Sequence, residues 1–269
     1  MFELRRARRI ALEAERPVVV MGRGHSGTRV LAWALEALGV SMGTLETKPT
    51  GDVQDRRFTR AIKRLAERGL ARPALAEPPP AELRRFRRAA ASYLRWLGRR
   101  RDPWGWKFPE TYLIGPVVDA VFPRARYIHM VRDGRDLAFR EHLTDDSGRR
   151  LGRALLERLD ALGEPHFVQA ALSWDFQVGR FCEFERERLG DRCHRLHFEA
   201  LCRAPVPAME AVADFLGVEM SDACRDYVSA NLRADKLAQH RDEDPEQVAR
   251  VETLIAPTLR ACGYEEDAR

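Results

Sequence analysis

The sequence predicts an α/β fold of three layers, in which helices cover both faces of a mostly parallel central sheet. Short apolar runs typical of buried strands, such as residues 18–21 and 125–131, alternate with longer segments that have helical periodicity. Strands that alternate with helices indicate a parallel sheet whose two faces are both covered. A glycine-rich turn at residues 22–27 follows the first strand, as in nucleotide-binding proteins with a phosphate loop.

The turn at residues 22–27 has the features of an anion-binding loop. Gly22 and Gly27 stand at the spacing of a phosphate-binding loop, between a strand and the start of a helix. The loop amides and the helix dipole converge on one point, which favours a bound anion. Thr28 and Arg29 replace the Lys and Ser/Thr that a nucleoside triphosphatase uses for phosphate and Mg²⁺. The sequence therefore predicts an anion site that works without the usual metal.

The first part of the chain is predicted to surround this loop with helices and irregular segments. Residues 40–52 contain glycine and proline, which indicates a loop that can pass over the binding crevice. Asp52 is a candidate N-cap for the next helix, and residues 70–80 carry the consecutive prolines of a linker or hinge. The predicted helices of this part cover residues 3–15, 30–38, 52–68 and 81–101.

The rest of the chain supplies the other strands and helices. Further strands are predicted at 104–107, 125–131 and 193–198, and helices at 111–121, directly after 132–136, and at 149–162, 166–189, 207–216, 221–230 and 244–262. In open parallel sheets, ligands bind at the carboxyl ends of the strands. The loop at 22–28 and Arg132 each follow a predicted strand directly and Lys107 ends another, so we expect three anion-binding groups on one rim of the sheet.

Composition sets limits on the class of protein. With 269 residues the chain has ample length for one large core, and a net charge of +5 favours an anionic ligand. Five cysteines without C-x-x-C spacing argue against a zinc site or a disulfide framework and predict a reducing, cytoplasmic location. Residues 1–16 are charged rather than signal-like, and no run approaches the ~18 apolar residues of a membrane span.

The motifs on this rim resemble those of sulfotransferases that use 3′-phosphoadenosine 5′-phosphosulfate (PAPS). In that family a loop like residues 22–28 holds the 5′-phosphosulfate, and residues 132–136 are similar to the 3′-phosphate motif, with Arg132 as the contact. Lys107, in the segment Trp-Lys-Phe-Pro, is similar to the Lys-x-Pro element near the transferring sulfate. The resemblance also includes residues 195–199, residues 215–218 and the closing segment around Lys236.

The resemblance covers about residues 17–263 and implies a single sulfotransferase domain over 1–269, with residues 40–101 as a helical and loop insertion over the acceptor site. It implies transfer of a sulfuryl group from PAPS to a hydroxyl or amine acceptor, without a required metal. The product nucleotide would be 3′,5′-adenosine bisphosphate (PAP). We expect a small-molecule or carbohydrate acceptor and no specific nucleic acid. The cofactor-binding residues that it implies are Arg23, Gly24, His25, Ser26, Gly27, Thr28, Arg29, Arg132, Arg140 and Lys236.

Two positions depart from the family pattern. His25 stands where many members have Lys, so Lys107 or Arg29 is a candidate for the lysine role. Arg140 replaces the usual Ser near the 3′-phosphate, where a guanidinium can still bind phosphate. Lys107 and His25 are the predicted groups that stabilise the departing charge.

A hydroxyl acceptor also needs a general base within hydrogen-bond reach. Glu46 and Asp52, in the loop after the first helix, are the first candidates, and His142 is the third. Trp104 and Trp106 are candidates for the acceptor pocket or for the core, and His129, inside an apolar strand, is expected in the core.

The sequence leaves two other functions open. A phosphate-loop kinase or nucleotidase shares the glycine spacing but needs the Lys-Ser/Thr pair that is missing here. A non-enzymatic module that binds anions or nucleic acid would use the basic helix at 81–101 instead.

Overall fold

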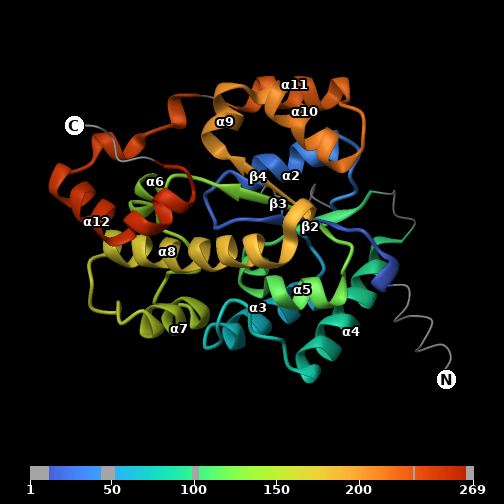
Figure 1. The fold of residues 1–269 in the computed structure, drawn as a ribbon, viewed down its shortest axis with the longest axis horizontal. Helices are drawn as coiled ribbons and strands as arrows, with labels where there is room; N and C mark the ends of the chain where they lie inside the picture. Colours follow the sequence, from blue (N-terminus) through green and yellow to red (C-terminus); the bar gives the residue numbers. More distant parts are fainter. Residues whose placement is uncertain (1–11, 44–51, 99–102, 233, 265–269) are drawn as a thin grey trace.

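The computed structural model describes residues 12–43, 52–98, 103–232 and 234–264. Its centre is a sheet of four parallel strands in the order β2-β1-β3-β4, which confirms the predicted fold class (Figure 1). The strands are β1 (Val18–Met21), β2 (Gly105–Lys107), β3 (Arg126–Val131) and β4 (Cys193–His197). All four lie where the apolar runs predict strands, within one or two residues.

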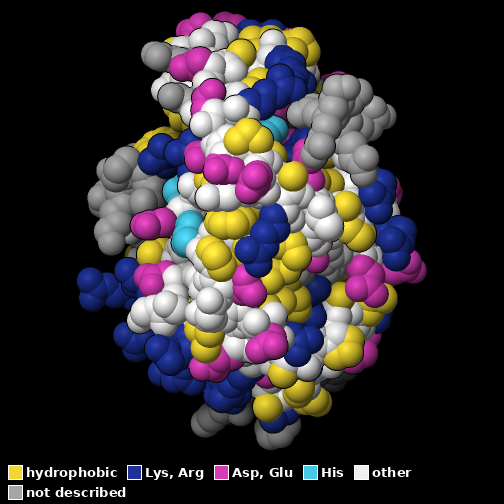
Figure 2. Space-filling view, turned by 90° about the vertical axis from the view of Figure 1, so that its left-hand side faces the viewer, with side chains coloured by type: hydrophobic (Ala, Val, Ile, Leu, Met, Phe, Trp, Pro, Cys, Tyr) yellow, Lys and Arg dark blue, Asp and Glu magenta, His cyan; other side chains and the backbone are white. Residues whose placement is uncertain are grey.

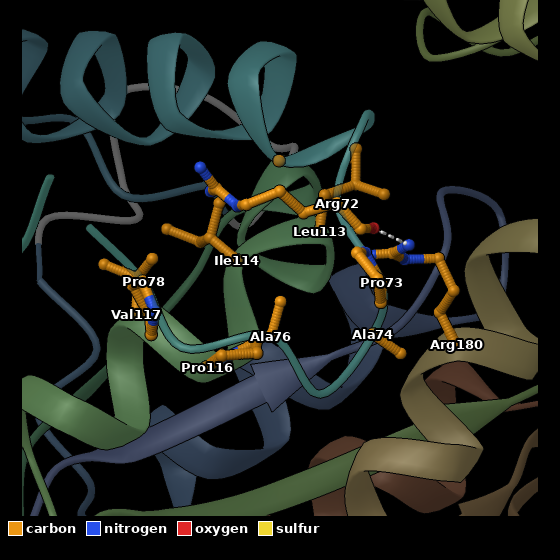
Figure 3. Close-up of a pocket in the computed structure, with 11 residues that line it drawn as sticks. Arg72, Pro73, Ala74, Ala76, Pro78, Leu113, Ile114, Pro116, Val117 and Arg180 are labelled. Carbon is orange, nitrogen blue, oxygen red and sulfur yellow. Dashed lines mark hydrogen bonds between the residues drawn. The ribbon is translucent and has the colours of Figure 1, made fainter.

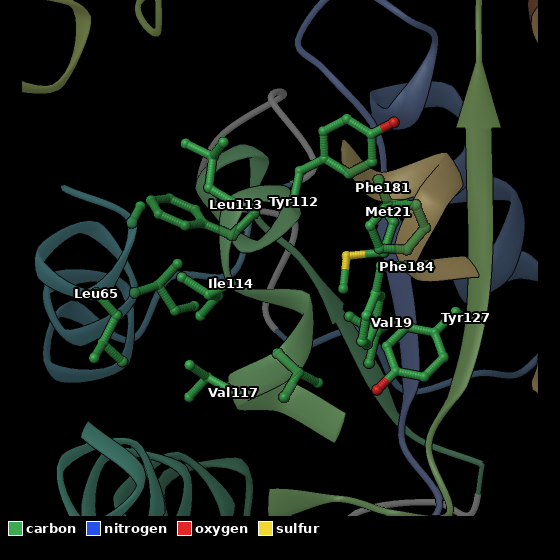
Figure 4. Close-up of a cluster of buried hydrophobic side chains, with 14 of the residues drawn as sticks. Val19, Met21, Leu65, Tyr112, Leu113, Ile114, Val117, Tyr127, Phe181 and Phe184 are labelled. Atoms are coloured by element: carbon green, nitrogen blue, oxygen red, sulfur yellow. The ribbon is translucent and has the colours of Figure 1, made fainter. Parts of the chain in front are cut away.

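Each face of the sheet is covered by its own group of helices, and β1 contributes to both cores because successive side chains point to opposite faces. Val18 and Val20 pack into one core, whereas Val19 and Met21 pack into the other (Figure 4). All four side chains are at most 2% exposed. Burial of a side chain of this size contributes about 1.5–3 kcal/mol, so this strand anchors both layers.

The two helical layers come from different parts of the chain. The core around Val18 and Val20 includes α2 (Thr28–Ala37), α9 (Phe198–Arg203), α10 (Pro205–Leu216) and α11 (Asp222–Asn231). The core around Val19 and Met21 includes α3 (Arg56–Gly69), α4 (Pro80–Leu97), α5 (Gly115–Val121), α7 (Arg150–Arg158), α8 (His166–Phe184) and α12 (Pro245–Ala261). The shorter elements are η1 (Pro109–Ile114), α6 (Gly134–Ala138), η2 (Glu185–Leu189), η3 (Gly190–Arg192), η4 (Ala234–Lys236) and η5 (Gln239–Asp242).

The observed N-terminus of α3 corrects one prediction. Asp52 does not cap α3; Asp55 does, because its Oδ1 accepts from the backbone N–H of Phe58 at 2.6 Å. Ser221 and Asp244 cap α11 and α12 in the same way, at predicted helix starts.

Two helical segments differ from the prediction. The segment predicted as one helix at 111–121 is divided into η1 and α5, since Pro116 has no N–H to continue the first turn. Helix α9, directly after β4, is not predicted because it is only one and a half turns long. The predicted helix at 3–15 lies largely outside the described residues, which show helix at 12–14.

Several aromatic and imidazole side chains belong to the core rather than to a binding site. Trp104 and Trp106 are at most 1% exposed and pack with other rings in the core around Val19 and Met21, so they do not line an acceptor pocket. His129 is buried as expected, between the hydroxyl of Tyr112 at 2.6 Å and the carboxylate of Glu185 at 2.7 Å. These hydrogen bonds satisfy both of its ring nitrogens.

The positively charged side chains are distributed unevenly over the surface. Figure 2 shows one face, where Lys and Arg side chains gather at the lower left and Asp and Glu side chains are scattered elsewhere. Within the described part of the chain, none of the helices has the length and apolar composition that crossing a membrane requires.

Candidate functional site

A cleft of about 1080 Å³ lies at the carboxyl ends of the strands. Ligands bind there in parallel sheets because the chain leaves β1 and β3 in opposite directions, which opens a crevice between their loops. The loop after β1, Lys107 at the end of β2 and Arg132 after β3 all contribute to its lining, so the three groups lie on one rim of the sheet. The described residues that line the cleft include Gly24, His25, Gly27, Thr28, Arg29, Asp52, Lys107, Arg132, Arg140, Glu141, His142, Leu143, Asp145, Asp146, Ser147, His166, Gln169, Phe198 and Gln239.

The loop between β1 and α2 is shaped by glycines that have no room for a side chain. A Cβ on Gly24 would lie 1.7 Å from Nε2 of His142, and one on Gly27 would lie 2.4 Å from the ring of Phe198. Gly27 also has a φ of 87°, which disfavours any residue with a side chain. Gly27 is the N-cap of α2 and offers no side chain to the first amides of the helix, whose residues Thr28, Arg29 and Val30 line the cleft.

Arg132 lies beside this loop and is nearly buried, with 7% exposure. Its Nη1 donates to the carbonyl of His25 at 3.3 Å and its Nη2 to Asp136 at 3.0 Å, while the guanidinium stacks 4.6 Å from the ring centre of Phe198. These contacts hold a cation at the wall of the cleft, next to the loop amides.

Segment 234–242 approaches the same wall through two sets of hydrogen bonds. Nη2 of Arg140 donates to Oε1 of Gln239 at 2.6 Å, and the backbone N–H and Nδ1 of His240 contact Oδ1 of Asp136 at 3.0 and 2.7 Å. Burial alone raises the pKa of Asp136, but hydrogen bonds from His240 and Arg132 outweigh it and hold the pKa at about 2. The backbone of Lys236 lies in η4, and its side chain is outside the described residues.

Lys107 and Asp52 meet at the edge of the cleft, with Nζ 2.5 Å from Oδ1. The backbone carbonyl of Lys107 accepts from the N–H of Val53 at 2.9 Å, which fixes the segment before α3 against the end of β2. Burial lowers the pKa of Lys107, and the charge of Asp52 opposes this effect. Glu46, the other predicted base, is outside the described residues.

The remaining predicted loop residues divide between the cleft and the interior. Arg29 is exposed and Thr28 is 5% exposed, and both line the cleft, whereas Ser26 is buried at 1% exposure. The Arg23 side chain is buried and pairs with Asp145 instead of lining the cleft. Its Nε and Nη1 have no hydrogen-bond partner among the described residues.

His25 is placed in the cleft but its Nε2 is already engaged. It lies 2.9 Å from the carbonyl of Glu141, so in the neutral ring this nitrogen donates to that oxygen. Burial lowers the pKa of His25 and the bond to Glu141 opposes the shift, with the net direction downward. The downward pKa shift thus favours the neutral imidazole at this position of the loop.

Sequence reasoning missed the segment 141–147, which forms one wall of the cleft, apart from His142. It also assigned no site role to Phe198 and did not foresee the pair of Asp136 with His240. No periodicity marks these residues, because they act through contacts between distant parts of the chain. Of the described residues in segment 40–101, Asp52 is the one that lines the cleft.

A second cavity lies between residues 72–78 and η1 with α5 (Figure 3). Arg180 closes one side, where its Nη1 donates to the carbonyl of Arg72 at 2.5 Å. The cavity has a volume of about 20 Å³, which is room for about one water molecule, so it is not a ligand site.

Sulfotransferases are the known proteins that this chain matches in a family model and resembles in fold. A family model described as the sulfotransferase family matches residues 17–222. A sulfotransferase from Alicyclobacillus acidocaldarius has a similar structure, with a TM-score of 0.52 and 18% identity over 93% of this chain and 94% of that chain. The sulfotransferase domain of the Synechococcus PCC 7002 olefin synthase gives a TM-score of 0.52 and 16% identity, over 91% and 96%.

Sulfotransferase STF9 from Mycobacterium avium matches with a TM-score of 0.52 and 15% identity, over all of this chain and 82% of that chain. At such identities the structural likeness shows the fold. Comparison with curated protein sequences finds no match.

Proposed function

This chain belongs to the sulfotransferase family, and on that premise we propose that it transfers a sulfuryl group from PAPS to a hydroxyl or amine group of a small-molecule acceptor. One observation carries the proposal. The glycine-rich loop after β1 and Arg132 after β3 lie on the same cleft, and the Arg132 side chain donates to the backbone of that loop. A nucleotide with anionic groups at both ends requires two cationic or amide-rich sites at such neighbouring positions.

The residues around the loop fit this donor. Gly24 and Gly27 bring the loop backbone to the cleft without side chains, and the N-terminus of α2 favours negative charge there. Bound PAPS would supply the activated sulfuryl group. The loop amides, with Ser26 and Thr28, would hold its 5′ end.

Arg132 would bind the 3′-phosphate, with Arg140 and Lys236 as further candidates. Arg140 lines the cleft from the same side as Arg132 and is tied to Gln239, so segment 234–242 would close over this end of the nucleotide. Guanidinium groups suit this task because they donate two parallel hydrogen bonds to phosphate oxygens.

Lys107 would stabilise the negative charge that develops on the departing phosphate, and Asp52 would accept the proton of the acceptor group. Both face the cleft, and Asp52 is 26% exposed at its side chain, which leaves it accessible to an acceptor. A cation in a nearly dry site stabilises developing charge more strongly than in water. Glu46 remains a second candidate for the base.

The acceptor would bind between Asp52 and the wall formed by residues 141–147. This wall carries Leu143, Asp146 and Ser147, and the start of α8 adds His166 and Gln169. Hydrogen-bonding groups outnumber apolar ones here, which suits an acceptor with several polar groups.

Calorimetry tests the proposed donor directly. The wild-type protein is titrated with PAP and, separately, with ATP plus Mg²⁺, and we expect PAP to bind at least tenfold more tightly, or about 1.4 kcal/mol. Turnover is then followed as PAP release from PAPS with a panel of monosaccharides, phenols and amines. Preference for ATP would contradict the proposal and favour a phosphate-loop kinase.

A further inference from the structure

His142 stands directly over the glycine-rich loop, on the wall of the cleft. A Cβ on Gly24 would lie 1.7 Å from its Nε2 and 2.1 Å from its Cδ2, so the ring edge occupies the space above this glycine. The ring also packs edge-on against His25, with 5.3 Å between ring centres. His142 is therefore packed directly against the glycine-rich loop at the edge of the cleft.

The contacts of His142 determine which ring nitrogen carries the proton. Its Nδ1 lies 3.2 Å from the backbone nitrogen of Thr144, which can only donate. The hydroxyl of Thr144 lies 2.8 Å from the same Nδ1. Nδ1 is therefore an acceptor, and in the neutral ring the proton is on Nε2. Among the described residues no hydrogen-bond partner of Nε2 is found, so this N–H is available to a ligand in the cleft.

The wall that carries His142 is fixed against the loop rather than free to adapt. Thr144 is 2% exposed and its hydroxyl accepts from Nε2 of Gln177 on α8 at 3.4 Å. The next residue, Asp145, pairs with Arg23 of the loop, and the carbonyl of Glu141 accepts from His25. Contacts on both sides of His142 thus hold residues 141–145 in place, which preorganises the imidazole.

These relationships assign His142 a role different from that of a base. We propose that the Nε2–H of His142 donates a hydrogen bond to the sulfuryl oxygens of a donor bound on the loop at residues 22–27. In this role it supplies the donor that His25 does not, because Nε2 of His25 is engaged by Glu141. The inference rests on the proposed function, since it concerns the group that is transferred.

Electrostatics around the ring agree with this role. Burial lowers the pKa of His142 most, and the nearby charges of Arg23 and Lys107, together with the neighbouring His25, lower it further, to about 3. Asp145 lies on the other side, with Oδ1 3.9 Å from Nδ1. The ring thus stays neutral and keeps a single N–H over the range in which enzymes normally work.

Nitrogen NMR of the histidine side chains tests the tautomer without any turnover. The His142 signals are assigned by their loss in His142→Gln and recorded from pH 5 to 8. We expect an unprotonated Nδ1 and a protonated Nε2 throughout, and a shift of the Nε2 signal on adding PAPS but not PAP, which lacks the sulfuryl group. A proton on Nδ1, a titration near pH 6.5, or equal shifts with both nucleotides would overturn the proposal.

Variants test the role in turnover. His142→Phe removes the donor and is expected to lower kcat about 100-fold or more, while PAP affinity by calorimetry stays within about twofold. His142→Gln places an amide N–H near the same point and should recover a substantial part of the loss. The control is His194→Gln on β4, whose ring packs on Phe215 away from the cleft, and it should behave as wild type.

The outcomes separate this inference from the proposed function. If the wild-type protein binds PAP but His142→Phe turns over normally, or if His142→Gln is as inactive as His142→Phe, the role of His142 is wrong and the proposed function stands. If the wild-type protein does not bind PAP, the proposed function and this inference both fail. Thermal melting confirms that each variant is folded.

Discussion

Lys107 and Asp52 lie 55 residues apart in the chain, yet their side chains form an ion pair with Nζ 2.5 Å from Oδ1 at the edge of the cleft. The two side chains differ in solvent exposure: that of Lys107 is 5% exposed and that of Asp52 is 26% exposed. The cation is thus held in the protein while the carboxylate reaches solvent, which suits a fixed positive charge beside a proton acceptor.

Replacement of the cation should affect catalysis more than nucleotide binding. Lys107→Met is expected to lower kcat about 100-fold or more, because the departing charge loses its partner, while PAP affinity changes less than about threefold. Steady-state kinetics and calorimetry with PAP measure the two effects. Lys63→Met, an exposed lysine on α3 with 52% side-chain exposure, is the matched control. Equal losses in turnover and affinity would contradict the assigned role.

Replacement of the carboxylate should lower turnover and also move its pH dependence. Asp52→Asn removes the proposed base, for a loss of about 100-fold or more at pH 7. It also removes the negative charge that opposes the burial-lowered pKa of Lys107, so the residual activity should decline at a lower pH on the alkaline side than in wild type.

A pH–rate profile of the wild-type protein and of Asp52→Asn measures this effect. The matched control is Glu77→Gln, an exposed carboxylate with 76% side-chain exposure that pairs with Arg188. If Asp52→Asn turns over at the wild-type rate at pH 6, Asp52 is not the base and Glu46 is the remaining candidate.

Arg132 should be needed for the nucleotide. Arg132→Ala is expected to weaken PAP binding more than tenfold, or by about 1.4 kcal/mol or more, since it removes a charged group from the 3′-phosphate. Arg126→Ala is the control, because Arg126 begins the same strand and packs over Phe215, whereas Arg132 follows the end of that strand. Unchanged PAP affinity in a folded Arg132→Ala protein would argue against a 3′-phosphate site here.

The contact of His240 with Asp136 predicts a pH dependence of stability. Burial lowers the pKa of His240, but its bond to Asp136 outweighs this, so the pKa is raised above the ordinary value of 6.5. The charged pair therefore stabilises the fold fully below pH 6.5 and loses this effect as pH rises through the raised pKa. In acid, the pair loses its stabilising effect between pH 3.8 and about 2, because Asp136 becomes protonated there.

His240→Gln should consequently cost about 2 kcal/mol of unfolding free energy near pH 5.5, the usual value of a hydrogen bond to a charged group. The difference from wild type should shrink at pH 9. Urea denaturation at both pH values measures it. If the difference in unfolding free energy between wild type and variant is the same at both pH values, the charge of His240 contributes nothing to stability.

Gly24 should be intolerant of even a methyl group. In Gly24→Ala the new Cβ would lie within 2.3 Å of three ring atoms of His142, so the ring has to move away from the loop. Because a misplacement of about 1 Å can cost about 100-fold in rate, we expect a large loss of turnover. Overpacking against the fixed ring should also cost about 1–3 kcal/mol of unfolding free energy. Gly163→Ala, with nothing within 4 Å of the new Cβ, is the control. Normal turnover of Gly24→Ala would place the reaction elsewhere.

The sequence by itself determined the four strands, the order of most helices and the loops that end on the cleft. Strands such as Val18–Met21 follow from apolar runs, and the loop at 22–27 follows from its glycines, because both signals are local. Lys107 and Arg132 could be assigned to the same rim from their positions in the chain alone, since parallel strands place their ends together.

Only the tertiary structure decided which side chains meet. Asp55 rather than Asp52 caps α3, which leaves Asp52 to pair with Lys107, and Arg23 turns inward to Asp145 instead of facing the cleft. The ring of His142 stands against Gly24, whereas Nε2 of His25 contacts the carbonyl of Glu141. Such pairings depend on how distant segments pack and which polar groups burial forces together, and no spacing within one segment encodes that.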